Sequence, residues 1–96
     1  MSSGDIARYV VTVTIPGESL TDLNELTNHF TLSGFLLTLT DEEGNVHDLG
    51  TNTYALISAL STDEVKALAS GLAESATGKP AEISVTTWDE WQKKEQ

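Results

Sequence analysis

Residues 61–80 carry the signals of one helix with both of its ends marked. Ser61 and Glu64 have the spacing of a capping box, in which a hydroxyl and a carboxylate satisfy backbone N–H groups of the first turn. Gly78 stands where a left-handed residue closes a helix, and Pro80 prevents its continuation. Apolar residues recur between these ends every three or four positions, so we expect an amphipathic helix that packs against another element.

The rest of the chain is divided into strand-like and helix-like segments. Alternating β-branched, aromatic and other apolar residues indicate strands, and a three-to-four-residue apolar spacing indicates a second helix. The expected elements are strands over 8–15, 35–40, 46–50 and 81–88 and a helix from the N-cap Ser19 to Gly34. Residues 53–60 are expected to continue the strand over 46–50 or to return beside it after a kink at 50–52, and a short helix is the alternative.

This order is strand, helix, strand, strand, helix, strand. With right-handed crossovers it predicts an α+β fold: a ferredoxin-like, two-layer β-α-β-β-α-β sandwich with two helices on one face of an antiparallel sheet. The inward face of the second strand is expected to carry Phe35, Leu37 and Leu39. We expect one acidic domain over residues 1–96, ending in a short polar tail over residues 89–96.

A hairpin turn is expected around Gly44, with two possible registers. A three-residue loop with Gly44 in the left-handed region pairs Leu37 with Leu49. A four-residue loop pairs Leu39 with Val46 instead. The sequence does not separate the two.

The charge distribution argues against several partners. Residues 9–65 hold nine carboxylates and neither Lys nor Arg, and the whole chain has a formal net charge of -10. Such a surface repels phosphate backbones and anionic lipids. We therefore expect no nucleic-acid partner and no membrane partner.

Common catalytic and targeting motifs are missing from the sequence. The chain has no cysteine, no glycine-rich phosphate loop and no nucleophile elbow, so we expect no enzymatic activity and no cofactor. Met1–Asp5 lacks the features of a signal peptide, and no apolar run approaches the ~20 residues that span a bilayer. The expected location is the cytoplasm.

One weak metal-site candidate lies in the first predicted helix. Asp22, Glu25 and His29 share a helix face and include three potential metal ligands. We favour a solvated polar stripe with a Glu25–His29 pair, and so expect no metal. His47 and Asp48 are neighbours in a strand and point to opposite faces, which makes them a poor general-base pair.

Two surfaces are candidate partner-binding sites. The outward sheet face is rich in Ser and Thr and includes Thr12, Thr38 and Thr86; it is either solvated or a surface for a dimer or a partner. Trp88 and Trp91 are candidates because tryptophan often anchors interfaces. We favour core packing for Trp88, and both readings remain open for Trp91.

The stretches Gly44–Gly50 and Trp88–Trp91 resemble small uncharacterised proteins of enterobacterial phages and prophages. The resemblance carries over no functional residues and implies an accessory phage protein that binds a host factor. We therefore expect a small non-catalytic interaction module with a protein partner or as a homodimer. The alternative is an acidic inhibitor that mimics nucleic acid and occupies a basic cleft, and a third option is a small enzyme without a visible motif.

Overall fold

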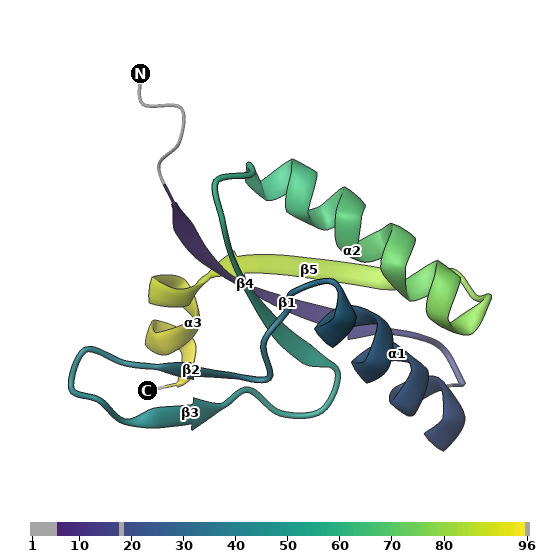
Figure 1. The fold of residues 1–96 in the computed structure, drawn as a ribbon, viewed down its shortest axis with the longest axis horizontal. Helices are drawn as coiled ribbons and strands as arrows, with labels where there is room; N and C mark the ends of the chain where they lie inside the picture. Colours follow the sequence, from purple (N-terminus) through teal and green to yellow (C-terminus); the bar gives the residue numbers. More distant parts are fainter. Residues whose placement is uncertain (1–5, 18, 96) are drawn as a thin grey trace.

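Three antiparallel strands form the centre of the molecule, with helices on both faces (Figure 1). The computed structural model describes residues 6–17 and 19–95, so the expectation about Met1–Asp5 lies outside the described residues. The elements are β1 (Ala7–Thr14), α1 (Leu20–Leu32), β2 (Thr38–Thr40), β3 (Val46–Asp48), β4 (Thr53–Ser58), α2 (Thr62–Thr77), β5 (Glu82–Thr87) and α3 (Trp88–Glu95).

Strand β1 is the middle strand of the central sheet, whose order is β4-β1-β5. Val10 lies opposite Ala55 of β4 and opposite Thr86 of β5. Because side chains alternate along a strand, Tyr9 and Val11 point to one face of the sheet and Val10 to the other. β1 is thus buried on both faces.

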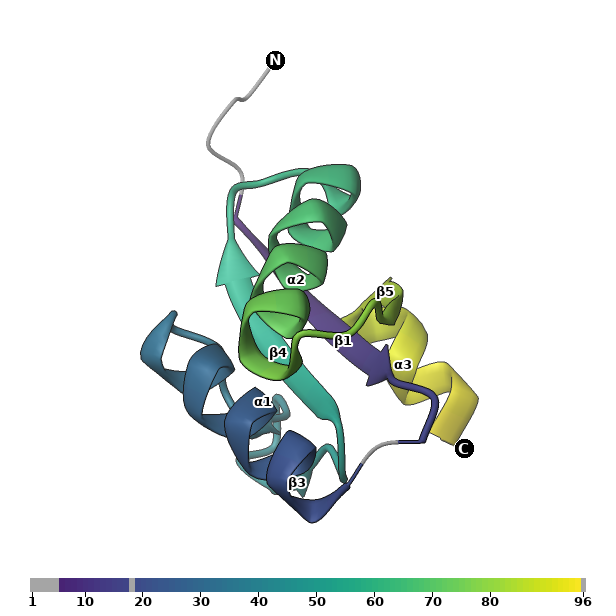
Figure 2. The same ribbon diagram turned by 90° about the vertical axis from the view of Figure 1, so that its right-hand side faces the viewer.

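Helices α1 and α2 cover the first face, as the sequence predicted (Figure 2). Leu26 and Phe30 of α1 meet Val65 and Ala69 of α2 in a core that includes the inward side chains of β1. Phe30 stacks on Tyr54 of β4 with ring centroids 4.6 Å apart. This core fixes α1 against the sheet.

Both long helices begin with the caps that the sequence indicates. Ser19 and Asp22 form a capping box on α1, and Ser61 and Glu64 form one on α2. Gly78 closes α2 in the left-handed conformation with φ 73°. No helix in residues 6–17 and 19–95 is long and apolar enough to cross a membrane.

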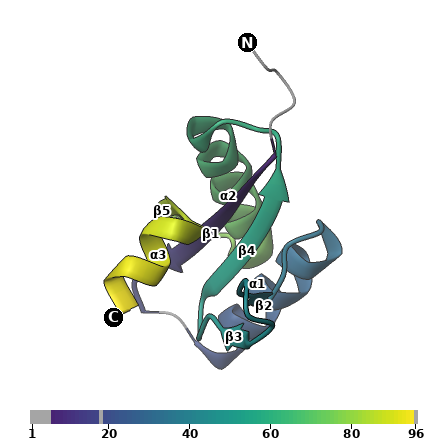
Figure 3. The same cartoon turned by 90° about the vertical axis from the view of Figure 1, so that its left-hand side faces the viewer.

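The second face of the sheet was expected either to be solvated or to bind a dimer or a partner, but its middle is covered by other parts of the same chain. Val10 has 0% of its surface exposed, and it packs with Ala55, Leu39, Leu49 and Trp88. These partners come from the β2–β3 hairpin and from α3, which lies on the side of the sheet opposite α1 and α2 (Figure 3). We call this group the second core.

The expected four-stranded sheet also does not form, because β2 and β3 make a separate two-stranded sheet. Leu36 exchanges backbone hydrogen bonds with Ala55 (2.7 and 2.8 Å), and the chain then bends at Leu37. Phe35 consequently enters the first core and Leu39 the second, while Leu37 stays 46% exposed. The α+β class is confirmed, but the ferredoxin-like strand arrangement is not.

Two open alternatives are resolved by backbone geometry. The hairpin has the three-residue loop: Asp41 N donates to Asn45 O at 2.9 Å, Gly44 has φ 91°, and Leu49 N donates to Leu37 O at 3.4 Å. The segment after Asn52 is a strand and not a short helix.

The expected polar tail over 89–96 is mostly helix α3. Thr87 caps it, because its Oγ1 accepts from Glu90 N at 3.3 Å. Trp88 and Trp91 are three residues apart, so they lie on one face of the helix and pack against the second core. The burial of these two tryptophans accounts for the position of α3. The polar composition of the rest of the segment gave no sign of this packing.

Candidate active site

Four side chains from three parts of the chain meet beside the second core. They are Arg8 of β1, Asp41 at the hairpin turn, His47 of β3 and Trp88 at the start of α3. His47 Nε2 lies 2.8 Å from Asp41 Oδ2, and the His47 and Trp88 ring centroids are 5.5 Å apart. The Arg8 guanidinium carbon lies 5.9 Å from the Trp88 ring centroid.

The hairpin turn fixes the Asp41 carboxylate. Its Oδ1 accepts from the backbone N–H groups of Glu43 and Asn45, both at 2.9 Å, and its Oδ2 faces His47. The hydrogen bond from His47, with the backbone donors Asn45 and Glu43, lowers the pKa of Asp41 to about 2. Asp41 is therefore ionised at neutral pH and can only accept hydrogen bonds.

The ionised carboxylate determines the tautomer of a neutral His47. Because Asp41 can only accept, Nε2 carries the proton that it donates, and Nδ1 keeps its lone pair. A carboxylate that orients an imidazole in this way prepares the other ring nitrogen to act as a base.

Trp88 supports both the imidazole and the guanidinium. It is 2% exposed, so its position is set by the core, and His47 meets its ring edge-to-face at an interplanar angle of 70°. Arg8 lies within cation–π range of the same ring and donates from Nη1 to Thr40 O at 3.4 Å. A hollow of about 360 Å³ borders Arg8, Trp88 and Asp89.

We expect the Asp41 pair to affect acid stability. The folded pKa is lowered from 3.8 to about 2, so the unfolded chain binds more protons between these values. The stabilisation is present above about pH 4 and is lost as the pH falls through about 2. Carboxyl-carbon NMR titration should give a pKa near 2 for Asp41 and a value nearer 3.8 in His47→Ala. A pKa near 3.8 in the wild type would contradict this.

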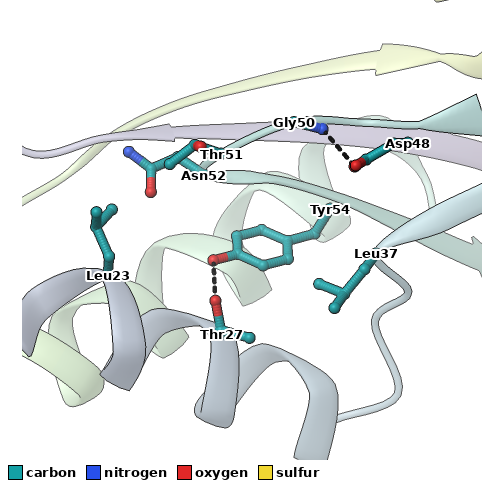
Figure 4. Close-up of a pocket in the computed structure, with 8 residues that line it drawn as sticks. All are labelled: Leu23, Thr27, Leu37, Asp48, Gly50, Thr51, Asn52 and Tyr54. Atoms are coloured by element: carbon teal, nitrogen blue, oxygen red, sulfur yellow. Dashed lines mark hydrogen bonds between the residues drawn. The ribbon is translucent and has the colours of Figure 1, made fainter. Parts of the chain in front are cut away.

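A second hollow, of about 320 Å³, lies between α1 and the segment from Asp48 to Tyr54 (Figure 4). Tyr54 is bonded through its hydroxyl to Thr27 Oγ1 at 3.3 Å. Asp48 Oδ1 accepts from Gly50 N at 3.1 Å. We call this hollow the Asp48 pocket; it is also lined by Leu23, Leu37, Thr51 and Asn52.

The weak metal candidates have local partners instead of converging on a metal site. Asp22 Oδ2 lies 2.7 Å from Lys79 Nζ and accepts from Ser19 N, and the Lys79 hydrogen bond is the main cause of its lowered pKa. Glu25 Oε1 is 3.7 Å from His29 Nδ1. Within the described ranges, no three His, Cys, Asp or Glu side chains are grouped as a metal site.

The predicted partner-binding residues lie in different environments. Thr12 and Thr86 are half-buried on the second sheet face, and Thr38 is exposed on β2. Trp88 is in the second core, and Trp91 is half-buried against it. A partner-binding role for these residues stays a prediction.

The pairing of Asp41 with His47 was not predicted from the sequence. His47 was compared only with its neighbour Asp48, and the turn around Gly44 was not considered as a source of its partner. The three-residue hairpin register places Leu39 opposite His47, and Asp41 is two residues beyond Leu39 on the same strand face. The three-residue register had been considered as one of two alternatives, and it alone would have indicated that Asp41 lies near His47.

Comparison with known proteins identifies the family of the chain. The Endoribonuclease GhoS family model matches residues 1–94. The chain is 58% identical over 91 residues to "Uncharacterized protein YdiZ" of Escherichia coli strain K12, and equally to the protein of that name in Escherichia coli O157:H7, with 95% of each chain covered. The chain therefore belongs to the Endoribonuclease GhoS family.

The family assignment corrects two expectations. An endoribonuclease is an enzyme that acts on RNA, so the predictions of a non-enzyme and of no nucleic-acid partner are wrong. Both relied on net charge and familiar motifs, whereas catalysis needs only a few groups in the right geometry. The relatives agree with the resemblance to small uncharacterised proteins, while its phage origin stays a prediction.

Proposed function

We propose that this chain is an endoribonuclease that cleaves single-stranded RNA at the site formed by Arg8, Asp41 and His47. The 2.8 Å bond between Asp41 and His47 carries the proposal, because it leaves Nδ1 of His47 as an oriented base, and Arg8 contacts the same tryptophan ring as His47. The family description supports RNA as the substrate.

The chemistry uses the ribose 2′-hydroxyl, the group that distinguishes RNA from DNA. His47 Nδ1 takes the 2′-hydroxyl proton, and the 2′-oxygen forms a bond to the adjacent phosphorus. The bond from phosphorus to the 5′-oxygen breaks, and the leaving oxygen takes a proton from the imidazolium or from water. The products are a 2′,3′-cyclic phosphate and a 5′-hydroxyl.

Arg8 has the second role, which is to bind the reacting phosphate. A guanidinium can donate two parallel hydrogen bonds to phosphate oxygens and stabilise the charge that develops there. An unpaired strand suits the site, because its backbone can turn the 2′-oxygen into line with the breaking bond.

The acidic surface affects affinity more than it affects the chemical step. Exposed charges farther apart than about 8 Å are largely screened at ~0.15 M salt, so distant carboxylates act weakly on a phosphate held at Arg8. RNA binding should therefore be weak and rely on few phosphate contacts.

The test compares cleavage of a fluorescent single-stranded RNA by the wild type, His47→Ala and His29→Ala, all purified identically. Loss of a general base should slow cleavage by about 100-fold or more in His47→Ala. His29 lies on α1, outside the site, so His29→Ala is the matched control and should retain the wild-type rate.

Substrate controls complete this experiment. A single 2′-deoxy nucleotide at the cleaved position should block cleavage there, and the products should carry a cyclic phosphate. Equal cleavage by the wild type and His47→Ala would reject the assigned site. Cleavage of the 2′-deoxy position would reject the chemistry.

A further inference from the structure

From the Asp48 pocket we infer a base-binding subsite that accepts one unpaired nucleobase carrying an amino group, and so favours cytosine, adenine or guanine over uracil. This inference rests on the proposed function, since the occupant is a nucleotide of the RNA substrate. The subsite would select where along a strand the chain binds.

The position of the pocket connects it to the candidate active site. Asp48 follows His47 in β3, so their side chains point to opposite faces of the hairpin. β3 pairs only with β2 within the described part of the chain, which leaves its other edge open to a passing strand. An RNA that crosses this edge can present a phosphate to the His47 side and a nearby base to the Asp48 side.

The size and walls of the pocket suit a base. Its volume of about 320 Å³ is at the small end of the ~300–1,000 Å³ range of ligand pockets. Leu23 and Leu37 supply apolar walls on either side of Tyr54 (Figure 4). Phe30 stacks on the Tyr54 ring and Thr27 bonds its hydroxyl, so this wall is already ordered.

The polar groups of the pocket indicate which part of the nucleotide enters. No Lys or Arg lines it, so a phosphate would meet only the negative charge of Asp48. A carboxylate accepts hydrogen bonds and pairs well with an amino group on a base edge. Uracil has no amino group, and its one donor on that edge, the N3–H, lies between two carbonyl oxygens that a carboxylate repels.

The test measures binding and cleavage separately. Fluorescence anisotropy in a His47→Ala background, which prevents turnover, compares an all-uridine RNA with the same RNA containing one central cytidine. Because the carboxylate–amino contact discriminates between the two bases, the cytidine RNA should bind at least ~5-fold more tightly. When Asp48→Asn is added, the affinities of the two RNAs should differ by no more than about 2-fold, because an amide can pair with either base.

The Asp48→Asn variant preserves the hydrogen bond from Gly50, since its amide oxygen still accepts, and a melting curve checks that it folds. The subsite is overturned if the two RNAs bind equally or if neither binds measurably. It is also overturned if Asp48→Asn leaves the ratio of the two affinities unchanged. Cleavage by the His47-intact chain without base preference rejects the subsite and keeps the proposed function. Base-selective binding without any cleavage rejects the proposed function instead.

Discussion

Replacing Asp41 with Asn is expected to reduce RNA cleavage by about 100-fold or more while leaving the hairpin folded. The Asn amide oxygen can still accept from Glu43 and Asn45, which preserves the turn. Its NH₂ group then faces His47 Nε2 as a donor, so Nε2 must accept and the imidazole proton moves to Nδ1. The nitrogen assigned as the base would no longer have a free lone pair.

Two measurements test this result. Cleavage rates should fall in Asp41→Asn nearly as far as in His47→Ala, and the double variant should lose little more, because residues that act as one unit are not additive. Nitrogen NMR of the His47 ring should show the proton on Nε2 in the wild type and on Nδ1 in the variant. A variant that cleaves within about 3-fold of the wild type would remove Asp41 from the mechanism.

Replacing Trp88 with Ala is expected to have the largest effect on stability, a loss of about 3–5 kcal/mol in the free energy of unfolding. Trp88 is 2% exposed and fills the space between Val10, Leu39 and Ala55, so its removal leaves a large cavity. The measurement is a denaturant titration followed by far-ultraviolet circular dichroism.

Trp91→Ala is the matched control, since Trp91 lies on the same helix face but is only half-buried. It should lose less than half as much free energy as Trp88→Ala. Coincident denaturation midpoints for the wild type and Trp88→Ala would show that the second core contributes little to stability.

Local signals in the sequence predicted the local structure well. The Ser61–Glu64 capping box, the Gly78 terminus and the turn at Gly44 each depend on residues a few positions apart. Such interactions are satisfied within one segment, so the sequence that encodes them is also contiguous. The composition of residues 53–60 favoured a strand over a short helix, and β4 over Thr53–Ser58 is that strand.

The second core was not predictable from these signals. It joins Val10, Leu39, Ala55 and Trp88, which come from four separate segments. A small bend at Leu37 decides whether the hairpin extends the central sheet or covers its other face, and no local pattern encodes that bend. The same long-range packing brings Arg8 and His47 to one tryptophan, so the site was hidden for the same reason.

The position of Trp88 has an evolutionary consequence. One indole fills the interior and also contacts both groups assigned to the reaction, so change at this position alters folding and chemistry together. A substitution of Trp88 therefore cannot change activity without also changing stability. Adaptation of such a chain to new RNA targets must instead proceed at exposed positions, such as those of the hairpin turn and Asp48 itself, where a substitution carries no penalty in the interior.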